Sequence, residues 1–147
     1  MSTPYESATL LIRLYELRRE TAMREARTWY ARSFSHTSAD DVVATVQGPN
    51  SAQFRMVTSY WEMAASMANR GAIDMEMFNE ANGEHLIVFA KMQPFLAEYR
   101  QRMASPKYLG ALEKLVMTTP GLAERLPAIR ERFKIPAPSM VIGQKSE

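Results

Sequence analysis

The sequence predicts an all-α fold: a single-domain bundle of about six or seven helices joined by short loops, with a mobile C-terminal tail. Apolar residues recur at spacings of three and four along most of the chain, which is the period of a helix face. Helix-capping residues precede these stretches, and Gly or Pro follows them. Alternation of apolar and polar residues never persists for more than a few positions, so strands are not expected. We expect residues 1–134 to form the domain and residues 135–147 the tail.

Composition narrows the classes of protein to which the chain can belong. A chain of 147 residues is long enough for one domain with a real core. The absence of cysteine excludes disulfides, thiolate catalysis and cysteine-ligated metal sites. No apolar run approaches the roughly 18–20 residues that span a bilayer, and the first residues lack the order of a signal peptide. The expected localisation is therefore cytoplasmic.

The first helical stretch is predicted to begin at Thr3-Pro4, where a capping threonine precedes a proline in the first turn. Its apolar face continues as far as Phe34 and includes Ala8, Leu11, Ile12, Tyr15, Ala22, Ala26 and Trp29. This spacing is compatible with one long helix or with two helices that break near Glu20-Thr21.

A short helix is expected after the polar segment that follows Phe34. Ser38 can cap it, and Asp40 and Asp41 fall in its first turn, where the helix dipole favours negative charge. The helix should run from Ala39 to about Val46, because Gly48-Pro49 ends it.

The central helix is predicted to begin at Asn50, with Gln53 in the position of a capping box. Its inner stripe consists of Phe54, Val57, Trp61, Ala64 and Ala68. Gly71 stands where a left-handed residue ends a helix. We expect the segment Tyr60–Ala68 to lie at the centre of the fold.

Two further helices are expected before the final third of the chain. Asp74 begins the first over Met75–Ala81, and Asn82-Gly83 ends it. The second begins near Leu86, and Pro94 kinks or divides it because proline removes an internal hydrogen bond.

The final helices follow a second cap-plus-proline pattern. Ser105-Pro106 is predicted to begin a helix over Lys107–Met117, and Thr119-Pro120-Gly121 leads into a short helical end over about residues 122–133. From Ile135 the chain reads Pro136-Ala137-Pro138, continues to Gly143 and ends in polar residues, which is typical of a tail.

Charge is unevenly distributed along the chain. Residues 1–34 hold six Arg and four Glu, a net +2; residues 35–90 hold two Arg and seven acids, −5; residues 91–147 hold ten Lys or Arg and five Glu, +5. One interpretation is solvated helix faces that attract one another in the folded protein. The other is a basic surface for an anionic partner.

No arrangement of residues predicts a metal or cofactor site, and none is typical of catalysis. The residues three positions before His36 and His85 are Ser33 and Asn82, so the Glu-x-x-His motif of di-iron bundles is absent. The helix break at Asn82-Gly83 separates Glu80 from Glu84 and His85, so these three side chains are not expected to bind a metal together. The sequence has no Gly-x-Ser-x-Gly elbow and no Gly-rich phosphate loop.

Four polar residues are the candidates for a site: Glu62, Arg70, His85 and Arg100. Glu62 follows a buried tryptophan, so its carboxylate should lie at the margin of the core. It is either a buried acid with a raised pKa or the partner of an arginine, with Arg100 the first choice and Arg70 the second.

The expected function is a non-catalytic interaction or regulatory domain whose partner is a second copy, as a homo-oligomer, or another protein. Eleven methionines fit either an adaptable binding surface or an irregular core. Nucleic acid is disfavoured as a partner because Glu residues alternate with the N-terminal Arg residues at helical spacing. The alternative is a small-ligand binder or enzyme with an internal polar pocket around the four candidates.

A dispersed pattern resembles a family of uncharacterised bacterial helical domains over about residues 54–115. The matching residues are Tyr60-Trp61-Glu62, Arg70-Gly71-Ala72-Ile73-Asp74, Phe78, Gly83, Pro94, Arg100, Tyr108 and Leu112. Phe89 stands where the family has a second tryptophan, and no apolar segment like the N-terminal membrane anchor of many members is found in this sequence. The resemblance implies an all-helical domain and supplies no catalytic residue.

Overall fold

The computed structural model describes residues 1–138, and within them the chain forms nine α-helices, two short 3₁₀ helices and no strand. The all-helical prediction is confirmed. The helices outnumber the six or seven expected because the chain breaks both at Glu20 and at Pro94. Most of the predicted tail falls on residues 139–147, which lie outside the described residues.

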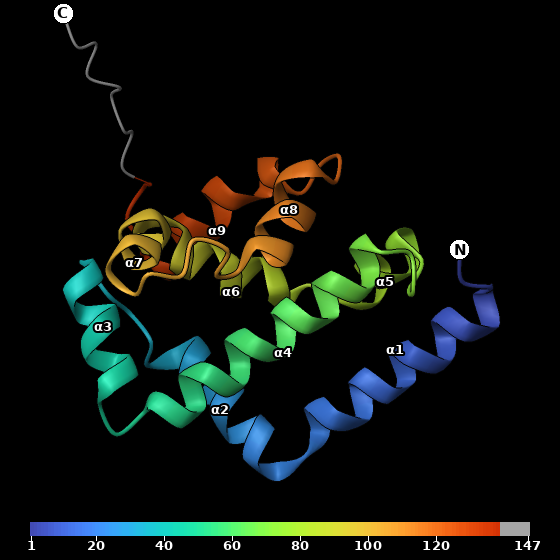
Figure 1. Cartoon of the computed structure of the whole chain (residues 1–147), viewed down its shortest axis with the longest axis horizontal. Helices are drawn as coiled ribbons and strands as arrows, with labels where there is room; N and C mark the ends of the chain where they lie inside the picture. Colours follow the sequence, from blue (N-terminus) through green and yellow to red (C-terminus); the bar gives the residue numbers. More distant parts are fainter. Residues whose placement is uncertain (139–147) are drawn as a thin grey trace, which may run out of the picture.

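Helices α1 (Pro4–Arg19) and α2 (Thr21–Arg32) are separate, which settles the choice between one helix and two. Glu20 has an extended backbone with ψ 141°, and the chain turns sharply there (Figure 1). Thr3 caps α1 as predicted: its hydroxyl accepts from the Glu6 N–H at 3.2 Å, and the Glu6 carboxylate accepts from the Thr3 N–H at 2.8 Å.

Helix α3 (Ala39–Gln47) is capped by Ser38, as expected. Helix α4 (Ser51–Asn69) then runs through the middle of the molecule, with α1 and α2 on one side and α6 and α8 on the other (Figure 1). Eight of its residues are buried: Phe54, Val57, Thr58, Tyr60, Trp61, Ala64, Ala65 and Ala68. The central position predicted for this helix is confirmed, but the capping box is not, because the Asn50 side chain makes no capping hydrogen bond.

Helix α5 (Met75–Ala81) begins as predicted, with the Asp74 carboxylate accepting from the Met77 N–H at 2.9 Å. Helix α6 (Glu84–Met92) is followed by the 3₁₀ helix η1 (Gln93–Phe95) and by α7 (Leu96–Arg102). Pro94 lies within η1 and divides α6 from α7.

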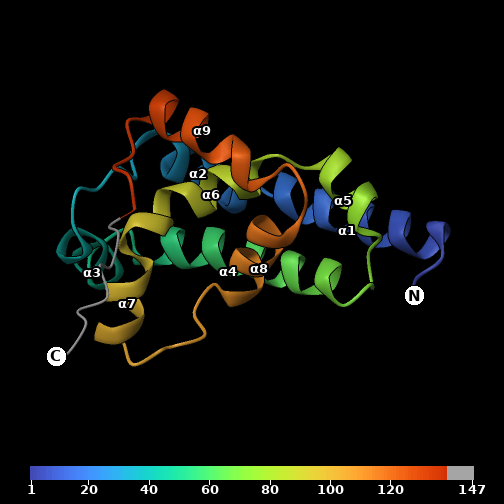
Figure 2. The ribbon, with the colours of Figure 1, turned by 90° about the horizontal axis from the view of Figure 1, so that it is seen from above.

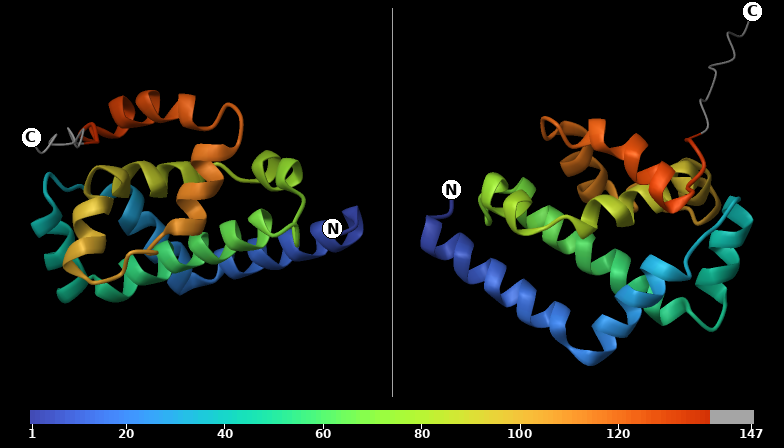
Figure 3. Two further views of the ribbon diagram at one scale, coloured as in Figure 1. Left: turned by 45° about the horizontal axis from the view of Figure 1, so that its top comes forward. Right: turned by 180° about the vertical axis from the view of Figure 1, so that it is seen from behind.

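Helix α8 (Gly110–Thr118) crosses α4 (Figure 2), and after η2 (Ala123–Arg125) helix α9 (Leu126–Phe133) lies along α6 (Figure 3). The predicted start of α8 at Lys107 is wrong. Leu109 has a left-handed backbone with φ 54°, so the helix can begin only at the next residue. None of the helices within residues 1–138 has the length and apolar character needed to cross a membrane.

Candidate functional site

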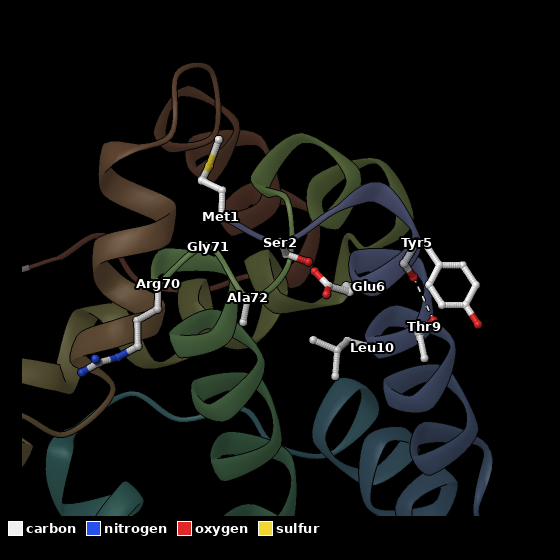
Figure 4. A pocket seen from close by; sticks show the side chains of 9 residues that line it. All are labelled: Met1, Ser2, Tyr5, Glu6, Thr9, Leu10, Arg70, Gly71 and Ala72. Carbon is white, nitrogen blue, oxygen red and sulfur yellow. Dashed lines mark hydrogen bonds between the residues drawn. The ribbon is translucent and has the colours of Figure 1, made fainter.

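The four polar residues singled out from the sequence do not line a common cavity. Arg70 borders a cavity at the N-terminal end of α1, and Glu62 borders a different one beside α7. Neither His85 nor Arg100 borders any of the five cavities described along residues 1–138. In Figure 4, Arg70 points away from the space between α1 and α4 into which Leu10 points.

Glu62 is not paired with an arginine, which corrects the prediction from its place beside Trp61. Its two carboxylate oxygens accept from the backbone N–H groups of Ala111 at 2.8 Å and Leu112 at 2.9 Å. These are free N–H groups of the first turn of α8, where the helix dipole favours a negative charge. Glu62 therefore caps α8 from a different helix.

Arg100 also contacts the start of α8 and the residues just before it, through different atoms of that segment. Its Nε donates to the Tyr108 carbonyl at 2.8 Å, and one terminal nitrogen donates to a Glu113 carboxylate oxygen at 3.1 Å. Glu62 and Arg100 are thus brought to the same short segment, residues 108–113, without contacting each other. Both fix the position of the start of α8.

His85 is fully enclosed, at 1% exposed, and packs against the rings of Trp61 and Phe78. The Asn79 amide nitrogen donates to the Met75 carbonyl, so its oxygen is left to accept from His85 Nε2–H at 3.1 Å. Burial lowers the pKa of His85 to about 4. The imidazole is therefore neutral at pH 7, which suits a core residue.

The cavity beside Glu62 combines apolar and polar lining residues. It has a volume of about 550 Å³ and lies among α3, α4, α7 and the loop before α8; we call it the α4–α7 cleft. Its walls include Val46, Phe54, Thr58, Tyr99, Tyr108 and Leu109. The sequence does not predict this cleft, because the lining residues come from four elements whose packing is set by long-range contacts.

The cavity at the N-terminal end of α1 has a volume of about 580 Å³ and is formed by the first turns of α1 and by the loop after α4 (Figure 4). Ser7 is buried behind it and accepts from the Asp74 N–H at 2.9 Å. This bond, with one from the Ser2 N–H to the Gly71 carbonyl at 3.1 Å, joins the start of α1 to the segment between α4 and α5.

Lys91 is a buried lysine that the sequence did not lead us to expect. Lys91 Nζ donates to the carbonyls of Tyr30, Ala31 and Phe34 at 2.8, 2.9 and 2.8 Å. These carbonyls lie at the C-terminal end of α2, where cations are favoured. Burial lowers the pKa of Lys91 to about 8. In the sequence, burial of Lys91 is indicated only by its position as the single charged residue in the apolar run 86–92.

Ion pairs connect the oppositely charged parts of the chain. Arg27 donates three hydrogen bonds of 2.6–3.0 Å to the Glu84 carboxylate, and Arg102 forms an ion pair with Asp40. Each pair joins a basic part of the sequence to the acidic part between residues 35 and 90. These contacts favour the first interpretation of the uneven charge, in which oppositely charged parts of the chain attract one another within the domain, over the second, a single basic surface.

The comparisons with known proteins identify a family. Residues 5–119 match the family described as Domain of unknown function (DUF4760). This range includes Glu62 and the whole of α8, and it stops before α9. The resemblance to an uncharacterised family is confirmed. No curated protein and no solved structure matches the chain.

Proposed function

The chain belongs to the family DUF4760, a domain of unknown function, and we propose that it is a non-catalytic interaction domain that pairs with a second copy of itself through α1. Its expected compartment is the cytoplasm. The observation that carries the proposal is an exposed apolar flank on α1, which we call the α1 flank. It consists of the exposed Tyr5, Ile12 and Tyr15 and the partly buried Ala8.

The α1 flank has the spacing of one helix face, three, four and three residues apart. Tyr5 is 81% exposed and Ile12 is 61% exposed, although both are large and apolar. The opposite face of α1 is already used, because Ser7 and Leu14 are buried against the rest of the domain. Contiguous exposed apolar surface on a soluble domain is typical of an interaction site.

A second copy is the partner that the pattern fits. If two α1 helices pack antiparallel about an axis at Ile12, residues whose numbers sum to about 24 face each other. Tyr5 of one chain then faces Arg19 of the other, which places an aromatic ring against a cation. The small Ala8 faces Glu16, which is adjacent to the large Tyr15 in the sequence.

Sedimentation equilibrium over a wide concentration range tests this pairing. We expect the mass of two chains for the unmodified protein and of one chain for Ile12→Arg, because two guanidinium groups would then meet on the axis. Met117→Arg is the matched control: Met117 is also exposed, at 48%, but lies on α8. A strict monomer at high concentration, or a dimer that Ile12→Arg leaves intact, would contradict the proposal.

A further inference from the structure

We propose that the α4–α7 cleft is a binding site for a small organic anion that has an apolar body and one negatively charged group. None of the residues that line the cleft belongs to α1. The inference is therefore independent of pairing through the α1 flank, and either can fail without the other.

The size and lining of the cleft suit a small molecule. A volume of about 550 Å³ falls within the range of roughly 300–1,000 Å³ found for ligand pockets. Phe54, Tyr99 and Leu109 are buried core residues that present apolar surface to it. Tyr99 and Tyr108 pack with their ring centroids 4.8 Å apart and form an aromatic wall. A flat apolar body can lie against such a wall.

The charged groups at the cleft favour a negative ligand. Arg55 and Lys107 line it and are exposed, and within residues 1–138 neither of them forms an ion pair. The nearby carboxylate of Glu62 is occupied on both oxygens by the N–H groups of α8, and that helix terminus offsets its charge. Two cations therefore remain available to an incoming anion.

The hydroxyl groups of Thr58 and Tyr108 inside the cleft are neutral. The Tyr108 hydroxyl lies 3.3 Å from Thr58 Oγ1, which donates in turn to the Phe54 carbonyl at 2.9 Å. Burial raises the pKa of Tyr108, so its phenol stays protonated and adds no repulsion. These hydroxyl groups can orient a ligand without opposing its charge.

The wall formed by the loop before α8 is held rigidly in place. Leu109 has φ 54° and Ala104 has φ 51°, two left-handed residues that are not glycine. The Arg100 bond to the Tyr108 carbonyl and the Glu62 cap fasten the end of this loop. Strained backbone held by its surroundings is found at ligand sites, and a preformed wall reduces the entropy lost on binding.

A matched pair of fluorescent probes tests the site. The anion 8-anilinonaphthalene-1-sulfonate and neutral N-phenyl-1-naphthylamine share one aromatic body and differ by the sulfonate. We expect saturable binding of the anion, with one site per chain. The double variant Arg55→Gln/Lys107→Gln should weaken its binding roughly tenfold and that of the neutral probe by less than about twofold, since two exposed ion pairs are lost. A higher salt concentration should weaken binding of the anionic probe but not of the neutral probe.

Two further variants locate the probe. Ser59 lies exposed on α4 at the cleft, so Ser59→Trp should fill the cleft without disturbing the core and should abolish binding of both probes. Arg24→Gln/Arg32→Gln removes the same charge from a cavity beside α2 and should leave binding unchanged. Binding that survives Ser59→Trp would overturn the site. Equal responses of the two probes to Arg55→Gln/Lys107→Gln would overturn the recognition of an anion.

Discussion

The carboxylate of Glu62 caps a helix that begins at Gly110, by accepting the N–H of Ala111, 49 residues later in the chain, at 2.8 Å. The residue at the N-cap position of that helix is Leu109, whose apolar side chain can accept no hydrogen bond. Helix α4 therefore supplies across the fold the acceptor that the local sequence lacks. The start of α8 depends on a tertiary contact rather than on its own residues.

Glu62→Gln should lower the free energy of unfolding by about 1–2 kcal/mol, as for the loss of other helix caps. The amide keeps one acceptor but turns a donor toward the second N–H group. Urea unfolding followed by circular dichroism measures the effect. Glu16→Gln is the control, because the Glu16 side chain is 58% exposed and its single ion pair is within α1. Equal losses for the two variants would mean that the cap contributes nothing.

The Arg27–Glu84 pair should show a coupling free energy of about 1–2 kcal/mol in a double-mutant cycle. The guanidinium makes three hydrogen bonds to the carboxylate, and the two side chains are only 27% and 23% exposed. The cycle uses Arg27→Gln and Glu84→Gln with chemical unfolding as the readout.

The Arg13–Glu16 pair provides the comparison for that cycle. Its single contact is 3.5 Å, and its side chains are 74% and 58% exposed. Its coupling should not exceed about 0.5 kcal/mol. A similar coupling for both pairs would show that burial and the number of hydrogen bonds do not distinguish them.

His85 should make the domain less stable in mild acid. Its pKa is about 4 in the folded protein, below the usual value of about 6.5 in an unfolded chain. The unfolded state therefore binds more protons between these values, so stability rises with pH from about 4 to 6.5 and is lost as pH falls. At pH 5 the domain should have lost about 2 kcal/mol relative to pH 7 through this group.

Urea unfolding at pH 7 and pH 5 measures the loss, and the substitution His85→Gln should remove it. The control is His36→Gln: burial lowers the pKa of His36 as well, but this side chain is only partly buried. That variant should keep most of the acid effect. An unchanged pH dependence in His85→Gln would assign the effect to other groups.

Ala104→Gly should stabilise the protein by up to about 1 kcal/mol. Ala104 is exposed with φ 51°, and a left-handed backbone is costly for any residue with a Cβ atom. Gly71→Ala should have the opposite effect, because Gly71 has φ 77°. Gly83→Ala is the neutral reference, since its φ is −134° and a Cβ atom there would meet nothing within 4 Å. Thermal unfolding would contradict the argument if Ala104→Gly were the least stable of the three variants.

Short-range features of the sequence determined the helical class and many helix ends. Thr3, Ser38 and Asp74 cap their helices as predicted, and Gly71 has the left-handed backbone expected of it. These features could be predicted because a capping bond joins residues about three apart, so the pattern along the chain contains both partners. The buried stripe of α4 follows from helical period in the same way.

The tertiary structure alone decided the partners of the partly or fully buried charged groups Glu62, Lys91 and Arg27. Glu62 contacts backbone N–H groups rather than an arginine, Lys91 binds carbonyls about sixty residues away, and Arg27 finds Glu84 across the domain. Each of these contacts depends on the angle at which two helices pack, which no spacing in the sequence encodes. The α4–α7 cleft is decided in the same way, because its walls come from four elements that only the folded core brings together.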